Sequence, residues 1–388
     1  MYQIMLVWLM LAAGIQIFKP ETKLNKILFG MSVLILTAMQ AFRYDQGPDY
    51  WGYRTIYATA PYKRGFPLEW YTCDMHGEKG FKFLINIFTN FGISATVFYG
   101  IFGIVIMGFV VYSIIKNSPY CNLSLLLFYP TFYLTYVMSN VRQAMITATF
   151  LAFALKLLQE EKYIKYIIIV LICSSIHVMS LFFLVLLPIK WIKEKWILYG
   201  IPIAWGGGML IAFTPIHKWL GLLPGLGRLM TTEVSVGGLL ERTIMYGVIS
   251  ALYWIYGNKN NKITFLYKIY GIGYLIAIAG MVTAYGSQRI TMPLKMVEII
   301  LLPLLLGECG RKTYQIIVWC CIAAISLSMS LKNLQSYSAN YNAFTYPYIS
   351  VWTKRTTEQR MQERKVGAIL GKKNLHREEI AYQKHQIK

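Results

Sequence analysis

The sequence has few charged residues. Only 14% of its 388 residues are Asp, Glu, Lys or Arg, while 56% are hydrophobic. A soluble protein of this length needs about 25% charged residues to cover its surface. Acidic residues are the scarcest, with 17 Asp and Glu against 38 Lys and Arg, which gives a formal net charge of +21. The composition therefore excludes an ordinary soluble domain and indicates an integral membrane protein.

Signatures of soluble enzymes and of metal sites are also missing. The six cysteines show no CxxC or Cys/His spacing, so neither a zinc site nor a disulfide framework is indicated. No GxGxxG, Walker lysine or HExxH motif occurs, which excludes coupling to ATP within this chain. No cofactor and no metal are expected, since no dense carboxylate cluster is visible. The basic residues stand in short gaps between apolar runs and in one tail, a pattern that orients membrane spans rather than binding nucleic acid.

Long apolar runs make up most of the chain. A bilayer core of about 30 Å needs about 20 helical residues per span, and nearly all of the runs qualify. We predict an all-α, polytopic membrane bundle of about 11 or 12 transmembrane helices, GT-C-like and without a large soluble domain. The first run lacks the basic start and cleavage site of a signal peptide, so we interpret it as a retained span. The runs cover residues 2–18, 24–42, 94–115, 123–137, 144–158, 163–187, 196–213, 239–256, 263–285, 290–306 and 314–331.

The lysines in short loops set the predicted orientation, because such loops stay in the cytoplasm. They divide the chain into a transmembrane domain over residues 1–351, with external loops at 43–80 and 214–238, and a basic tail over 352–388. From residue 354 onward the tail has ten Lys and Arg against four Glu. Its charge favours the cytoplasm, but the number of spans places it outside, and we follow the number of spans.

The run 163–187 breaks this alternation. As a single span it would deliver Lys190, Lys193 and Lys195 to the outside, against the rule. We therefore predict that it splits at 174–177 into two half-length helices, with His177 at the turn in an outward-facing cavity.

The loop after the second span combines charged and aromatic residues: Arg43, Asp45, Asp49, Tyr50 and Tyr53. Guanidinium groups pair bidentately with phosphate, carboxylates accept from sugar hydroxyls, and aromatic faces stack on sugar rings. The segment is therefore a candidate site for a phosphorylated glycan. The alternative is an interfacial aromatic belt in which Asp49 caps a helix.

Two arginines stand next to glutamines at span boundaries. Arg142 and Gln143 come just before the fifth span, where a helix N-terminus favours an anion. Gln288 and Arg289 repeat the arrangement in a short loop at 286–289 between two later spans. Two such arginines could grip a diphosphate, and the alternative for Arg142 is a side chain that snorkels to the headgroups.

Two further features are ambiguous. His177 is the one histidine inside an apolar run, so it could act as a general base or donate to phosphate, or it could simply bond between helices. Tyr346 and Tyr348 could form an external aromatic platform after the last span, or belong to the interfacial belt.

Taken in order, these motifs resemble the EpsG family of Wzy-type bacterial polysaccharide polymerases. The resemblance covers about residues 1–350, and the basic tail departs from it. Each motif is weak alone, but the series is fairly specific. It consists of Arg43 with Gly47-Pro48-Asp49-Tyr50 and Tyr53, Glu78-Lys79-Gly80-Phe81, Val141-Arg142-Gln143, His177, Gln288-Arg289 and Tyr346-Pro347-Tyr348.

The resemblance implies an enzyme that joins oligosaccharide repeat units carried on undecaprenyl diphosphate, at the outer face of the bacterial cytoplasmic membrane. Its expected partners are this lipid-linked oligosaccharide, the bilayer and a chain-length regulator or flippase. A hydroxyl of one unit would attack the anomeric carbon of another, and the lipid diphosphate would leave. Arg142 and Arg289 would stabilise the leaving group, and the base would be Asp45, Asp49 or His177. The remaining substrate-binding candidates are Arg43, Tyr50, Tyr53, Gln143, Gln288, Tyr346 and Tyr348.

Three alternative functions share part of this pattern. A ligase would use the same chemistry on another acceptor, and a membrane O-acyltransferase could use His177 as its base. A lipid-linked glycan transporter would be expected to carry inverted repeats and charges at the bilayer midplane. We see no clear repeat and expect the ionisable groups to lie at one face, which favours the polymerase.

Overall fold

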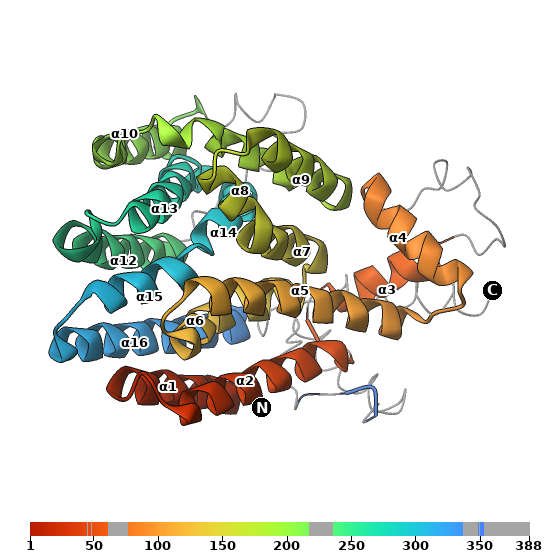
Figure 1. Ribbon diagram of the computed structural model, residues 1–388. Coiled ribbons are helices and arrows are strands. Elements are labelled where there is room, and N and C mark those ends of the chain that lie inside the picture. The colour runs from red at the N-terminus through yellow and green to blue at the C-terminus, as the bar shows by residue number, and fades with distance from the viewer. Residues whose placement is uncertain are drawn as a thin grey trace.

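The computed structural model describes residues 1–44, 46–47, 49–60, 77–216, 236–336, 348 and 350–352, without the side chains of 282, 284–286, 288, 335 and 336. Within this part the chain is helical, and its one extended pairing is an isolated antiparallel bridge between Arg43 and Ser350. The long helices lie side by side, with the short α3 and α4 beside one end of the bundle (Figure 1). The predicted all-α fold class is confirmed.

The helices follow the predicted apolar runs closely. Seven of them, counted over the described residues, are long and apolar enough to cross a membrane, and α1, α9 and η4 are shorter apolar helices. The chain is therefore a multi-pass membrane protein. The α-helices are α1 (Tyr2–Phe18), α2 (Lys23–Ala41), α3 (Tyr50–Ala58), α4 (Lys79–Asn90), α5 (Ala95–Asn117), α6 (Cys121–Phe128), α7 (Val141–Thr149), α8 (Leu155–Gln159), α9 (Tyr163–Ile176), α10 (Glu194–Phe213), α12 (Val236–Leu252), α13 (Asn261–Ala279), α14 (Ala284–Lys295), α15 (Glu298–Glu308) and α16 (Lys312–Ser336).

Turns of other pitch continue several of these helices. The π-helical η2 (Tyr129–Val137) extends α6, η3 (Phe150–Ala154) joins α7 to α8, and η5 (Tyr253–Gly257) extends α12. Two 3₁₀ segments, η4 (Val178–Lys190) and η6 (Met281–Thr283), follow α9 and α13.

Glycines allow neighbouring helices to approach closely, as is usual in membranes. A Cβ atom at Gly271 of α13 would lie 2.6 Å from Cγ2 of Ile197 on α10. A Cβ atom at Gly103 of α5 would overlap the side chain of Gln40 on α2. Because the lipid-facing sides of the bundle are apolar as well, this close packing, rather than the exclusion of water, holds the helices together.

The lysines assigned to the cytoplasm gather at one end of the bundle, which we call the lysine end. Lys312, at the start of α16, donates to the backbone carbonyl of Ile17, which lies in the last turn of α1 (2.6 Å). Lys190, at the end of η4, pairs with Glu161 just before α9 (2.7 Å). Loops that are far apart in sequence therefore meet here, as the predicted alternation of spans requires.

Arg54, Arg142 and Arg289 lie at the opposite end, which we call the arginine end. The helix α5 connects the two ends: Thr96 in its first turn accepts from Arg54 (2.8 Å), and Lys116 lies in its last turn. A rise of about 1.5 Å per residue puts these positions about 30 Å apart, the thickness of a bilayer core.

The run 163–187 is broken, as predicted. The helix α9 ends at Ile176, His177 is extended (φ −153°, ψ 117°), and η4 returns beside α9. The hydroxyl of Tyr166 on α9 donates to the carbonyl of Phe183 on η4 (2.6 Å), which joins the two halves. Both outer ends of this hairpin lie at the lysine end, and His177 lies at the arginine end.

One predicted loop is wrong, and another contains short helices. The segment 286–289 is helical, because the chain turns earlier, at Gly280 and η6, and α14 already begins at Ala284. The predicted external loop 43–80 contains α3 and the start of α4, whose aromatic residues pack on α5. Most of the predicted loop 214–238 and all but the first residue of the tail lie outside the described residues.

The hairpin predicts where an added thiol can be labelled. In a chain whose six cysteines have been replaced, Lys193→Cys at the lysine end should resist a membrane-impermeant thiol reagent in intact cells and react after permeabilisation. The matched control is Phe91→Cys, in the turn between α4 and α5 at the arginine end, where the native side chain is 78% exposed. It should react in intact cells. Labelling of Lys193→Cys from outside would contradict the topology.

Candidate functional site

The helix α3 packs its first turn against the segment that leads into α7. Asp49 and Tyr53 are one helical turn apart, so they project from the same face of α3. Ser139 donates its hydroxyl to Oδ2 of Asp49 (2.9 Å), and the hydroxyl of Tyr53 donates to Oδ1 of Asn140 (3.0 Å). Asp49 stands at the N-cap position of α3 but makes no side-chain capping bond there. The predicted loop is thereby fixed to the start of α7.

Arg142 lies in the first turn of α7, as predicted. Asn140 caps this helix by accepting from the backbone N–H of Gln143 (3.5 Å). The guanidinium group of Arg142 stacks over the ring of Phe81 (5.3 Å), and its Nε donates to the hydroxyl of Tyr53 (3.4 Å). Its side chain is 11% exposed, so this cation is largely withdrawn from solvent.

Glu78, at the N-cap position of α4, balances this charge. It forms an ion pair with Nη1 of Arg142. Its other oxygen, Oε1, accepts from the backbone N–H of Val178 (3.1 Å) and lies 4.0 Å from Nδ1 of His177. One carboxylate thus joins α4, α7 and the break between α9 and η4. We did not select Glu78 from the sequence, although it opens the Glu78-Lys79-Gly80-Phe81 motif and although Arg142 lacks an acidic neighbour in sequence.

His177 is buried at the turn of the hairpin. Its Nδ1 accepts from the backbone N–H of Met179 (3.3 Å) and so caps η4. When the ring is neutral, a nitrogen that accepts leaves the proton on the other nitrogen. Nε2 is then a hydrogen-bond donor. The positive charges of Arg142 and Arg289 both act on this ring.

Arg289 lies on α14, which packs against α7. The side-chain amide of Gln143, fully buried, donates to the backbone carbonyl of Arg289. The two arginine motifs, which are nearly 150 residues apart in sequence, are therefore adjacent in the fold. The side chain of Gln288 lies outside the described part of the structure.

Buried ion pairs hold α14 in place. Nζ of Lys295 lies 2.8 Å from Glu241 on α12 and 3.6 Å from Glu298 on α15. The next residue on α12, Arg242, donates to Thr291 of α14 (2.7 Å). Glu241 and Arg242 of α12 thus bind α14 at two positions one helical turn apart, close to Arg289.

The expectation that ionisable groups lie at one face of the bundle is therefore wrong. Glu298 accepts from the hydroxyl of Tyr270, halfway along α13 (3.2 Å), so this network extends toward the middle of the bundle. Charges are tolerated at such depth because they neutralise one another and share hydrogen bonds. Sequence reasoning missed this network because its pairing depends on how three helices pack: Glu241 lies on α12, Lys295 on α14 and Glu298 on α15.

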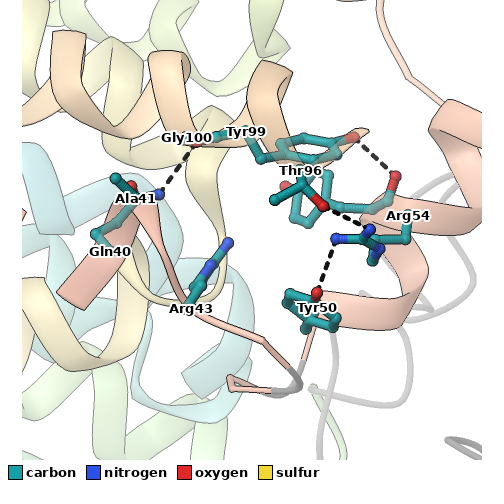
Figure 2. A pocket seen from close by; sticks show the side chains of 9 residues that line it. Gln40, Ala41, Arg43, Tyr50, Arg54, Thr96, Tyr99 and Gly100 are labelled. Atoms are coloured by element: carbon teal, nitrogen blue, oxygen red, sulfur yellow. Dashed lines mark hydrogen bonds between the residues drawn. The ribbon is translucent and has the colours of Figure 1, made fainter. Parts of the chain in front are cut away.

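A separate small pocket lies beside this cluster, between α2, α3 and α5. Arg43 and Arg54 reach it from opposite sides, and Figure 2 shows Arg54 donating to Tyr50 and Thr96. The hydroxyl of Tyr50 accepts from Arg54 at 2.7 Å. Arg43 donates to the carbonyl of Met138. Tyr50 and Arg43 therefore line one pocket, as candidates for the same ligand would.

The end of the described chain closes over α2. The hydroxyl of Tyr348 donates to the carbonyl of Met39 (2.8 Å), and Ser350 bridges to Arg43. Gly47 has a positive φ of +94° and faces the carbonyl of Met138 so closely that a Cβ atom would overlap it. Asp45 and Tyr346, two of the predicted site residues, lie outside the described residues.

The structure thus brings most of the predicted residues together. Asp49, Tyr53, Arg142, Gln143, His177 and Arg289 form one cluster, to which Glu78 is added. Arg43 and Tyr50 lie in the neighbouring pocket, and Tyr53 lines both. Cations that can hold an anion and carboxylates that can accept a proton are therefore side by side at the arginine end.

Comparison with known proteins gives one match. A model of the EpsG family matches residues 26–350, which is most of the chain and includes every residue of this cluster. No curated protein and no solved structure matches the chain.

The ion pair between Glu78 and Arg142 predicts a stability effect. Glu78→Gln keeps the shape of the side chain but removes its charge, so it should lower the free energy of unfolding by about 2 kcal/mol. The matched control is Glu160→Gln at the lysine end, where hydrogen bonds from Lys162 and Lys156 lower the pKa of Glu160. That pair is exposed and should contribute little. Thermal unfolding in detergent measures both; equal midpoints for the two variants would contradict the structural role of Glu78.

Proposed function

Because the chain belongs to the EpsG family, which is associated with polysaccharide biosynthesis, we propose that it is a polysaccharide polymerase. It joins oligosaccharide repeat units carried on undecaprenyl diphosphate. The observation that carries this proposal is the cluster of Arg142, Arg289, Glu78 and Asp49 at the end of the bundle opposite the lysines. A transfer between lipid-linked units needs cations for the diphosphate and a base for the hydroxyl, and both are present there.

The distribution of lysines between the two ends of the bundle supports an outward-facing site. The positive-inside rule assigns the lysine end to the cytoplasm, so the arginine end faces outward. Lipid-linked units that have been moved across the bacterial cytoplasmic membrane would meet the site there. The polymerase therefore works at the outer face, in the plane of its substrates' diphosphates.

Arg142 and Arg289 stabilise the leaving group. The hydroxyl oxygen of the acceptor unit forms a bond to the anomeric carbon of the donor unit, and the bond from that carbon to the diphosphate oxygen breaks. The electron pair stays on the lipid diphosphate, which needs charge stabilisation rather than a proton. Glu78 keeps Arg142 oriented toward the start of α7, and Gln143 fixes the backbone of Arg289 next to it.

Asp49 is the proposed base that takes the acceptor proton. Its carboxylate is exposed and accepts from a neutral hydroxyl, that of Ser139. Both oxygens of Glu78 are already engaged, one by Arg142 and the other by a backbone N–H. His177 presents a protonated Nε2 when neutral, which suits it to donate to a substrate oxygen rather than to accept a proton.

One observation favours a second candidate, a carrier of the same lipid-linked glycan. The buried network of Lys295, Glu241 and Glu298 places charges deep in the bundle, as transporters do. Glycan from a deletion strain separates the candidates. Single repeat units on lipid at the outer face indicate a polymerase, whereas the absence of external units indicates a carrier. Full-length chains without acyl groups would indicate an O-acyltransferase.

The arginines predict a loss of rate when their geometry changes. Arg142→Lys and Arg289→Lys each keep the charge but lose the two-pronged fork that matches a phosphate. Polymerisation should fall at least about tenfold in each, equivalent to about 1.4 kcal/mol of transition-state stabilisation. Arg311→Lys is the control, because Arg311 stacks on Tyr314 at the lysine end. Wild-type chain lengths in the first two variants would exclude the role.

If Asp49 is the base, its replacement should abolish catalysis but leave substrate binding intact. Asp49→Asn is nearly isosteric and can still accept from Ser139, but it cannot take a proton. We expect it to abolish polymerisation by purified protein while lipid-linked repeat units still bind. Asp45→Asn should be milder. If Asp49→Asn polymerises at the normal rate, Asp49 is not the base and His177 becomes the candidate.

A further inference from the structure

A second cavity lies at the lysine end between α5, α8, α13 and α15. Three lysines from three different helices line it: Lys116, Lys156 and Lys262. Most of the remaining lining is apolar and includes Leu155 and Phe265. The cavity therefore combines a cationic rim with an apolar wall.

The charge of this rim is largely uncompensated. No carboxylate of the described chain lines the cavity. Lys156 pairs with Glu160 (3.3 Å), which also binds Lys162 (2.7 Å), so this acid is shared between two lysines. Lys116 donates to the hydroxyl of Tyr112 (2.8 Å), a neutral partner. A net positive charge remains, and it favours an anionic ligand.

The depth of the cavity matches lipid headgroups. Lys116 lies in the last turn of α5 and Lys262 in the first turn of α13, both of which are membrane spans. Residues at the ends of spans lie where lipid phosphates are found, and basic pockets between helices on the cytoplasmic side bind anionic headgroups. The apolar wall lies further along the same helices, at the depth of acyl chains.

We propose that this cavity binds an anionic phospholipid. Lys116, Lys156 and Lys262 hold its phosphate, and the upper part of an acyl chain lies against Leu155 and Phe265. A water-soluble anion would use only the rim and leave the apolar wall uncovered. The site is separated from the arginine cluster by the length of α5, so it does not depend on the proposed reaction.

The test measures lipid binding to the purified full-length chain. The probes are vesicles of phosphatidylcholine alone and vesicles that also contain phosphatidylglycerol. We expect phosphatidylglycerol to be retained preferentially, and to raise the thermal unfolding midpoint. The variant Lys116→Gln/Lys156→Gln/Lys262→Gln should weaken its binding about tenfold, equivalent to about 1.4 kcal/mol. The same three lysines changed to Arg should keep binding, which controls for folding.

A matched control removes the same charge elsewhere at the lysine end. Lys23→Gln/Lys193→Gln/Lys195→Gln changes three exposed lysines outside the cavity and should bind as the unaltered chain does. Equal losses in both Gln variants would show general attraction to an anionic surface and overturn the site. Equal stabilisation by inorganic phosphate alone would assign the rim to a small anion and overturn the lipid. No preference for phosphatidylglycerol would overturn the proposal as well.

Discussion

The ion pair between Glu78 and Arg142 is the contact on which the arginine end depends. A buried guanidinium group is tolerated only when its charge is compensated and its donors are used. Glu78 supplies the compensation from the start of α4, whose Phe81 also packs against Phe102 of α5. The same carboxylate accepts from Val178, so the pair also fixes the tip of the α9–η4 hairpin. Three elements that are remote in sequence are thus oriented by one pair.

The breaks in the helices are the second constraint. An interrupted helix leaves backbone N–H groups without their helical partners, so these groups need other acceptors. At the tip of the hairpin, the backbone N–H of Val178 donates to the carboxylate of Glu78, and that of Met179 donates to Nδ1 of His177. These bonds place an acid and a histidine where the chain stops being helical. The same two side chains therefore accept hydrogen bonds from the free backbone N–H groups and belong to the candidate site.

How much of this the sequence predicts depends on whether the signal is local. The break at His177 follows from the lysines that flank it, and the position of Arg142 follows from the start of an apolar run. Glu78 opens a motif of the family resemblance, but its pairing with Arg142 could not be predicted, because the partner is 64 residues away. The network around Lys295 was missed for the same reason: charges within an apolar run do not indicate which neighbouring helix will neutralise them.

The two arginines are connected by a chain of hydrogen bonds. Arg142 donates to Tyr53, Tyr53 donates to Asn140, and the Asn140 amide donates to Gln143 (3.4 Å). Gln143 in turn donates to the carbonyl of Arg289.

All of these hydrogen bonds run in the same direction, so reversing one of them would leave a partly buried donor or acceptor unsatisfied. The positions of the two cationic segments are therefore fixed before any substrate arrives. Electrostatic stabilisation of a developing charge is most effective under that condition, because no reorganisation is needed during the reaction. Tyr53 is the link that also lines the pocket of Arg43 and Arg54. The geometry of the cluster around Arg142 and that of the neighbouring pocket are consequently set by the same side chain.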